Sequence, residues 1–150
     1  MGRILRKIKT SFYKLFHKKL RNCKLYDCPR IYFNSKLIIG TNTTINDSIF
    51  IHAAGGVEIG KNCVLSHGVT ILSIGLSTKD WDKRNITKDS HVCKKVSIGN
   101  NVWLCANVTV CPGVTIANNV IVAAGAVVCE DLKEPNSLYG GIPAKRIKDI

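Results

Sequence analysis

The first 24 residues of this 150-residue chain contain no acidic residue, although they hold nine of its 22 lysines and arginines. The formal net charge of +12 at pH 7 therefore comes mostly from this segment. A nucleic-acid-binding domain usually carries its basic patch on the folded domain itself. Basicity confined to one terminal segment is weak support for nucleic-acid binding, and we expect no nucleic-acid partner.

The chain also lacks any run of the ~18 apolar residues that a transmembrane helix needs, and its N-terminus lacks the apolar core of a secretory signal. The seven cysteines include no CxxC pair and no zinc-ligand spacing with histidine. An odd number of cysteines at small apolar positions indicates a reducing compartment. We expect a cytoplasmic protein, either free or peripheral at the inner face of the membrane, with no metal.

A six-residue period dominates residues 96–128. An aliphatic residue returns at every sixth position, at Ile98, Leu104, Val110, Ile116, Val122 and Val128. An α-helix needs apolar spacing near 3.6, and the short strands of a sandwich do not repeat at six. A fixed period of six is typical of a parallel β-helix, in which each unit supplies one short strand and one corner. Stacked coils then bury the aliphatic positions as interior ladders.

The same period runs earlier in the chain, where one unit carries two extra residues at 53–56. Its aliphatic positions are Ile39, Ile45, Ile51, Ile59, Leu65 and Ile71. Between residues 73 and 95 the repeat is interrupted by a charged, aperiodic segment. Long loops inside compact domains are usually functional or disordered, and the His, Trp, Asp and Arg residues here favour a functional loop. We expect one β-helix domain over residues 25–150, with an inserted loop at 73–95.

Residues 3–21 have the pattern of a basic amphipathic helix within a separate segment, 1–24. One helical face holds Ile4, Leu5, Ile8, Phe12, Leu15, Phe16 and Leu20, and lysines and arginines fill the other. Such a helix can lie in the interface of an anionic membrane. It can equally dock its apolar face on its own domain or on a neighbouring subunit. The sequence leaves both interpretations open.

Three motifs carry a family resemblance: IGNNVW at 98–103, PGVTI at 112–116 and GGIPAKRIK at 140–148. Together with the repeat, they resemble the hexapeptide-repeat acyltransferases, above all the maltose, galactoside and polysaccharide O-acetyltransferases. The resemblance covers about residues 37–148. It implies an all-β, left-handed parallel β-helix, a homotrimer, acetyl-CoA as acyl donor and a hydroxyl or amine as acceptor.

The resemblance also implies roles for individual residues. Trp103 matches a tryptophan beside the acyl-donor channel, and Ala106 and Ala124 match positions whose backbone lines that channel. Lys145 and Lys148 match basic positions near the nucleotide end, where a phosphorylated adenosine needs cations. The acceptor-side expectations are Asn46, which matches an acceptor-contacting asparagine, together with His52 and Asp80.

The expected catalytic base is missing from its family position. Counting from Ile59, the loop histidine of the maltose-type enzymes falls on Leu76. Acyl transfer to a hydroxyl needs a general base near the acceptor oxygen, most often histidine. His91 and His67 are the main candidates, His52 is a weaker one, and Asp80, Asp82 or Asp89 could orient the imidazole. Backbone N–H groups at a glycine, Gly75 for example, could stabilise the oxyanion.

We therefore expect an acetyl-CoA-dependent O-acetyltransferase that acts on a sugar or polysaccharide-precursor hydroxyl. One alternative is a serine acetyltransferase-like enzyme, although the large N-terminal helical domain of that family is not present in these residues. A second is a catalytically inactive β-helix that binds or scaffolds. A third, a metal-dependent hydratase, needs a three-histidine site at a subunit interface.

Overall fold

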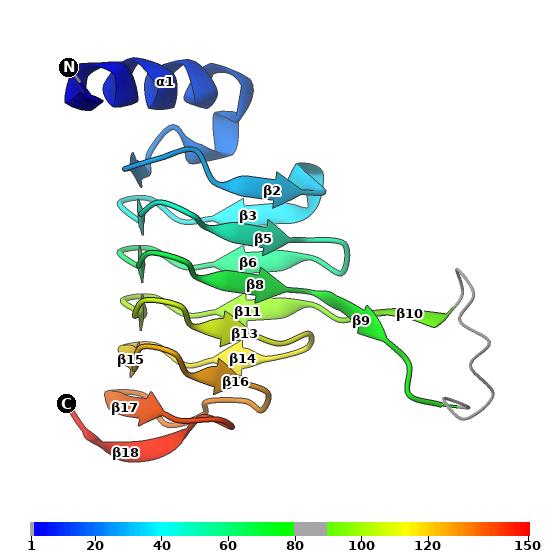
Figure 1. Ribbon diagram of the computed structural model, residues 1–150. Coiled ribbons are helices and arrows are strands. Elements are labelled where there is room, and N and C mark those ends of the chain that lie inside the picture. The colour runs from blue at the N-terminus through cyan, green and yellow to red at the C-terminus, as the bar shows by residue number, and fades with distance from the viewer. Residues whose placement is uncertain (1, 80–89) are drawn as a thin grey trace.

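The computed structural model describes residues 2–79 and 90–150. The chain winds into a stack of triangular coils, with the N-terminal helix across one end (Figure 1). Three sheets of parallel strands, one of them extended by a final antiparallel strand, form the sides, and we call them sheets A, B and C. Sheet A holds β1 (Lys24–Leu25), β4 (Thr44–Ile45), β7 (Val64–Leu65), β12 (Trp103–Leu104), β15 (Val120–Val122), β17 (Ser137–Gly140) and β18 (Lys145–Asp149).

The other two sides are built in the same way. Sheet B holds β2 (Arg30–Tyr32), β5 (Phe50–His52), β8 (Thr70–Leu72), β13 (Thr109–Val110) and β16 (Val127–Val128). Sheet C holds β3 (Leu37–Ile39), β6 (Val57–Ile59), β11 (Val96–Ile98) and β14 (Thr115–Ile116). The predicted β-helix, with one N-terminal helix, is confirmed.

The strands pair in register, so the aliphatic positions of successive coils lie above one another. In sheet A, Ile45 pairs with Leu65, Leu65 with Leu104, and Leu104 with Val122. All four are fully buried. A single coil cannot bury its own inner face, so this stacking creates the core.

The first coil begins earlier than the sequence pattern indicates. Leu25 on β1 pairs with Ile45, and Ile31 on β2 pairs with Ile51, so both are ladder positions. The pattern from Ile39 onward missed them because residues 22–36 contain Pro29 and a 3-10 turn, η2 (Asn34–Lys36). Together with β3, these residues form the first coil.

The corner between sheets B and C takes all the insertions. It accommodates η2 in the first coil, residues 53–56 in the second, and the interruption at 73–95 in the third. The described part of that interruption contains an antiparallel ribbon, β9 (Ile74–Leu76) paired with β10 (His91–Cys93). The ribbon projects away from the stack (Figure 1). The segment predicted to be a loop therefore has regular structure at its base.

Each end of the stack has its own cover. α1 (Gly2–Phe16) and η1 (Lys18–Leu20) lie at the N-terminal end, where Leu20 is fully buried. At the other end, β17 runs parallel to β15 and β18 turns back antiparallel to β17. No helix among the described residues is long and apolar enough to cross a membrane.

Candidate functional site

One corner of the stack brings the candidate site residues together. The second residue after each sheet A ladder position lies at the corner that leads into sheet B. We call these positions the corner column: Asp27, Asp47, His67, Ala106 and Ala124. Backbone hydrogen bonds join its coils, since the N–H of Asn107 donates to the carbonyl of His67 and that of Gly125 to Ala106.

His67 and Asp47 form an ion pair within this column. The His67 Nδ1 lies 2.8 Å from the Asp47 Oδ2, and both side chains are about half exposed. The hydrogen bond from His67, helped by a backbone N–H, holds the pKa of the Asp47 carboxyl below its usual range. An ionised carboxylate favours the tautomer that carries the proton on Nδ1. This leaves the Nε2 of the half-exposed His67 side chain as the acceptor nitrogen.

Trp103 lies beside this pair on the outer face of sheet A. Its indole N–H donates to the Ser66 hydroxyl across 3.0 Å, and 46% of the residue is exposed. This hydrogen bond fixes the indole ring one coil below Ser66, the residue that precedes His67. The structure therefore brings the predicted Trp103, Ala106 and Ala124 to the same corner as His67.

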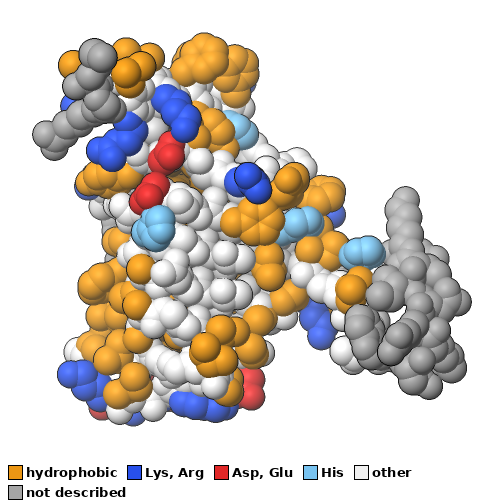
Figure 2. All heavy atoms as spheres, in the orientation of Figure 1, with side chains coloured by type: hydrophobic (Ala, Val, Ile, Leu, Met, Phe, Trp, Pro, Cys, Tyr) orange, Lys and Arg blue, Asp and Glu red, His pale blue; other side chains and the backbone are white. Residues whose placement is uncertain are grey.

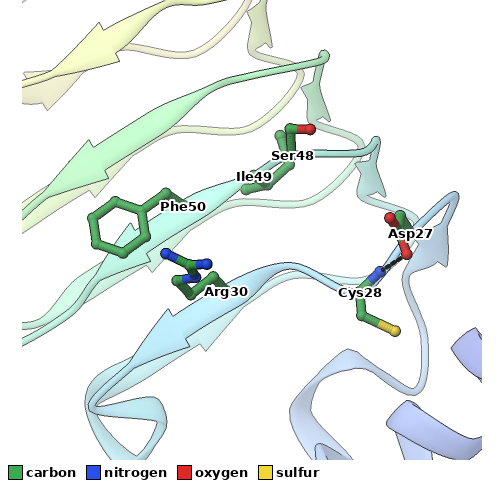
Figure 3. Close-up of a pocket in the computed structure, with 6 residues that line it drawn as sticks. All are labelled: Asp27, Cys28, Arg30, Ser48, Ile49 and Phe50. Atoms are coloured by element: carbon green, nitrogen blue, oxygen red, sulfur yellow. Dashed lines mark hydrogen bonds between the residues drawn. The ribbon is translucent and has the colours of Figure 1, made fainter.

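A cleft of about 380 Å³ opens one coil above the His67–Asp47 pair (Figure 3). It is lined by Asp27, Cys28, Arg30, Ser48, Ile49 and Phe50. The Asp27 carboxylate accepts the Cys28 N–H and pairs with Lys9, which holds its pKa below the usual range. The Arg30 guanidinium makes no ion pair with any residue that the structure describes. The cleft therefore combines a carboxylate that is paired with Lys9 and a guanidinium that has no ion-pair partner among the described residues.

His91 lies on the projecting ribbon, directly opposite Leu76 in the antiparallel pair. Opposite residues of such a pair point to the same face with Cβ atoms about 5 Å apart. His91 thus places an imidazole next to the position where the resemblance expects the loop histidine. The ribbon follows β8 whereas His67 precedes it, so the two histidines lie at opposite ends of this strand. One chain does not bring them together.

A second hollow, of about 400 Å³, opens at the base of the ribbon. It is lined by Gly75, Leu76, Ser77, Thr78, Val92, Lys94 and Pro112. Gly75, considered for the oxyanion, pairs with Val92 in the ribbon. The ribbon therefore has a groove of its own, away from the corner column.

The three residues predicted to contact the acceptor differ in their surroundings. The Asn46 amide donates to the carbonyl of Leu65, so this group supports the coil stacking. His52 packs among Tyr32, Phe33 and Phe50 on sheet B, and its buried Nδ1 has no described hydrogen-bond partner. Asp80 lies outside the described residues, as do Asp82 and Asp89.

The two predicted nucleotide-end lysines lie on β18, in the hairpin that covers the C-terminal end. The Lys145 ammonium is 2.8 Å from the Glu130 carboxylate, which lowers the pKa of that carboxyl. Lys148 is exposed opposite Leu138. Both lysines lie at the end of the stack that is farthest from α1 (Figure 1).

Sequence reasoning missed Asp47, Ser66 and Arg30. The signal for Asp47 was present, because Asp47 follows Ile45 by two residues just as His67 follows Leu65. Equivalent positions in adjacent coils stack about 4.8 Å apart, which is within reach of a side-chain hydrogen bond. Arg30 gave no such signal because the first coil was not recognised.

Comparisons with known proteins agree with this architecture. Residues 95–130 match the family described as "Bacterial transferase hexapeptide (six repeats)", and residues 36–73 match "Hexapeptide repeat of succinyl-transferase". Both stretches of the six-residue repeat therefore match models of hexapeptide-repeat transferases. A "Polysialic acid O-acetyltransferase" of Neisseria meningitidis is 36% identical over 91 residues. The match takes in 58% of this chain but only 37% of that relative's length.

Solved structures of hexapeptide-repeat proteins share the fold. A hexapeptide-repeat acetyltransferase of Vibrio cholerae, complexed with acetyl coenzyme A, superposes with a TM-score of 0.79 at 25% identity. The alignment covers 93% of this chain and 77% of that one. A maltose O-acetyltransferase of Clostridium difficile gives a TM-score of 0.75 at 24% identity, over 97% of this chain and 86% of its own.

Proposed function

We propose that this protein is an acetyl-CoA-dependent O-acetyltransferase that modifies a hydroxyl of a sugar or polysaccharide precursor. The observation that carries the proposal is the His67–Asp47 pair, exposed in the corner column beside Trp103. A histidine oriented by a carboxylate is the group that acyl transfer to a hydroxyl requires. Named relatives support the class, since one is a polysialic acid O-acetyltransferase and another was solved with acetyl coenzyme A.

The chemistry follows from the positions of the two nitrogens. The His67 Nε2 takes the proton of the acceptor hydroxyl while the oxygen of that hydroxyl attacks the thioester carbonyl carbon. The C–S bond then breaks, and the CoA sulfur takes the proton back from the imidazolium. Asp47 stabilises the charged imidazole between these two proton transfers.

The donor would lie along the corner column below His67. Ala106 and Ala124 leave room there because they present only methyl groups in two successive coils. The indole of Trp103 would flank the channel, and Lys145 and Lys148 would meet the phosphates at the C-terminal end. Lysine ammonium groups suit phosphates as point charges.

The acceptor would enter through the cleft above Asp47. Arg30 supplies a cation without an ion-pair partner among the described residues, and Ser48 supplies a hydroxyl. A guanidinium recognises carboxylates and phosphates through paired hydrogen bonds. We therefore propose that the acceptor sugar is acidic. Acetylation should be faster with a carboxylated acceptor than with its neutral analogue.

His91 is the second candidate for the base, because it lies opposite Leu76 in the ribbon. The ribbon extends away from its own stack (Figure 1), so His91 would act at the corner column of a neighbouring subunit. This arrangement requires an oligomer, and we propose the homotrimer that the resemblance implies. Asn46, His52 and Asp80 stay proposals for acceptor contact.

Separate substitutions test which histidine is the base. Acetyl transfer from acetyl-CoA to a carbohydrate acceptor is followed through release of free CoA thiol. If His67 is the base, His67→Ala lowers kcat by about 10²–10⁴-fold and leaves acetyl-CoA binding unchanged. His91→Ala gives this result if the ribbon histidine is the base. Full turnover in both variants would exclude both residues.

Calorimetry with acetyl-CoA distinguishes an enzyme from an inactive scaffold. Binding of acetyl-CoA without turnover on any carbohydrate acceptor would favour a scaffold. Failure to bind would remove the basis of the proposal. Acetylation of serine in preference to sugars would favour the serine acetyltransferase-like alternative.

A further inference from the structure

The N-terminal helix packs on the stack with its polar face and directs its apolar face outward. Six large apolar side chains of α1 are between 61% and 71% exposed, namely Ile4, Leu5, Ile8, Phe12, Leu15 and Phe16. They recur at helical spacing, so they share one side of α1. A helix that docks on its own domain normally buries this side. Here the arrangement is reversed.

Polar contacts from the opposite side hold α1 in this orientation. The Lys9 ammonium pairs with Asp27 at 2.8 Å, and the Tyr13 hydroxyl donates to the Pro29 carbonyl at 2.7 Å. The Lys14 ammonium donates to the Cys23 carbonyl. Burial raises the pKa of Tyr13 to about 12, so this donor keeps its proton at neutral pH. The inner face is therefore engaged, and the apolar face is left outside.

The surroundings of the apolar face are strongly cationic. Residues 1–24 contain no acidic side chain, and Lys7 and Lys18 are both exposed. A shallow hollow on this face is lined by Lys7, Ile8, Ser11, Phe12 and Leu15. Apolar side chains gather at this end of the molecule, with lysines and arginines close by (Figure 2). Apolar residues bordered by cations complement the interface of an anionic bilayer.

We propose that the outer face of α1 docks the protein on the surface of an anionic membrane. A symmetric contact between two copies of this face would bring two acid-free, basic segments together, so like charges would repel each other. Anionic lipid headgroups neutralise the cations while the six apolar side chains enter the acyl boundary. The stack then stands end-on to the bilayer, because α1 lies across its end (Figure 1).

This orientation has a consequence for the proposed transferase, on whose function it rests. The cleft with Arg30 and the His67–Asp47 pair belong to the first three coils, next to α1. At about 4.8 Å per coil, His67 lies only about 10 Å beyond the first coil. An acceptor attached to a lipid would therefore reach the site close to the membrane surface.

Vesicle flotation of the full-length protein tests the docking surface. The vesicles are phosphatidylcholine alone, or phosphatidylcholine with about 30 mol % phosphatidylserine. We expect flotation only with the anionic vesicles, weakened by added salt. Ile8→Asp combined with Phe12→Asp should lower the floated fraction about tenfold or more. Ile147→Asp combined with Ile150→Asp, which adds the same two charges at the exposed opposite end, should float like the wild type.

Circular dichroism and sedimentation show whether the same proteins keep the wild-type secondary structure and oligomeric state. Docking is supported if the double variant keeps the wild-type spectrum and oligomeric state but no longer floats. The proposal is overturned if the wild type does not float with anionic vesicles, or if the double variant floats equally well. It is also overturned if the double variant dissociates an oligomer while wild type shows no lipid binding, because the face would then be a subunit interface. None of these readouts depends on acetyl transfer.

Discussion

His67 and Asp47 are 20 residues apart in the sequence but occupy the same position in adjacent coils. The pair is exposed, so its value for stability is small. Its importance is orientation, because the hydrogen bond to Nδ1 determines which nitrogen can accept a proton. In the proposed mechanism Asp47 acts on the acceptor only through His67, as a positioning residue.

Asp47→Asn tests this role. The amide preserves the shape of the side chain but removes the charge that stabilises the imidazolium. We expect kcat to fall about tenfold or more while the KM for acetyl-CoA stays unchanged. The pH profile of kcat should shift as well, since a merely structural residue would leave it unmoved. An unchanged profile with full activity would contradict the assignment.

The corners of the stack depend on asparagine. Within residues 2–79 and 90–150, six asparagines have a backbone φ between 53° and 60°: Asn42, Asn62, Asn101, Asn107, Asn119 and Asn136. Asparagine tolerates this left-handed conformation better than most residues because its short amide can hydrogen-bond locally. Their side chains also join coils, as the Asn101 amide does by donating to the Asn119 Oδ1 at 2.9 Å.

Replacement of Asn101 separates backbone strain from the loss of the side-chain bond. Asn101→Ile forces a β-branched residue into the left-handed region, and should lower the free energy of unfolding by about 1–2 kcal/mol. Asn101→Gly loses the same amide but accepts the conformation freely, so its cost should be clearly smaller. Urea denaturation measures both. Equal losses would show that the strain argument is wrong.

The whole molecule separates its two candidate bases, since His67 precedes β8 and His91 belongs to the ribbon that follows it. If both act in one active site, that site must join two subunits. The ribbon would then complete the corner column of the neighbouring copy. The proposed homotrimer makes this arrangement possible.

Mixed oligomers provide the test, provided that each single variant is inactive. His67→Ala and His91→Ala subunits are unfolded together, refolded in equal amounts and assayed. If each site takes His67 from one subunit and His91 from its neighbour, about a quarter of the sites regain both residues. Activity should recover to about that fraction of wild type. No recovery after confirmed subunit exchange would show that one subunit supplies both, or that the sites are not shared.

The sequence alone was sufficient for the fold, because a six-residue period has few other physical solutions. Aliphatic residues such as Leu104 and Val122 are removed from water only when the coils stack. The local repeat is enough to predict this stacking, without knowledge of contacts between distant residues. The motifs around Trp103 and in 140–148 were also sufficient to indicate the family.

Only the tertiary structure decided the relations between coils and the orientation of α1. The partnership of His67 with Asp47 depends on the length of one coil, including its two extra corner residues. The amphipathic pattern of residues 3–21 fits a helix docked on the protein as well as a helix bound to a membrane. Which face points outward depends on the contacts of Lys9 with Asp27 and of Tyr13 with Pro29. Asp27 and Pro29 belong to the first coil. The helical periodicity of residues 3–21 does not reveal which residues outside the helix it contacts.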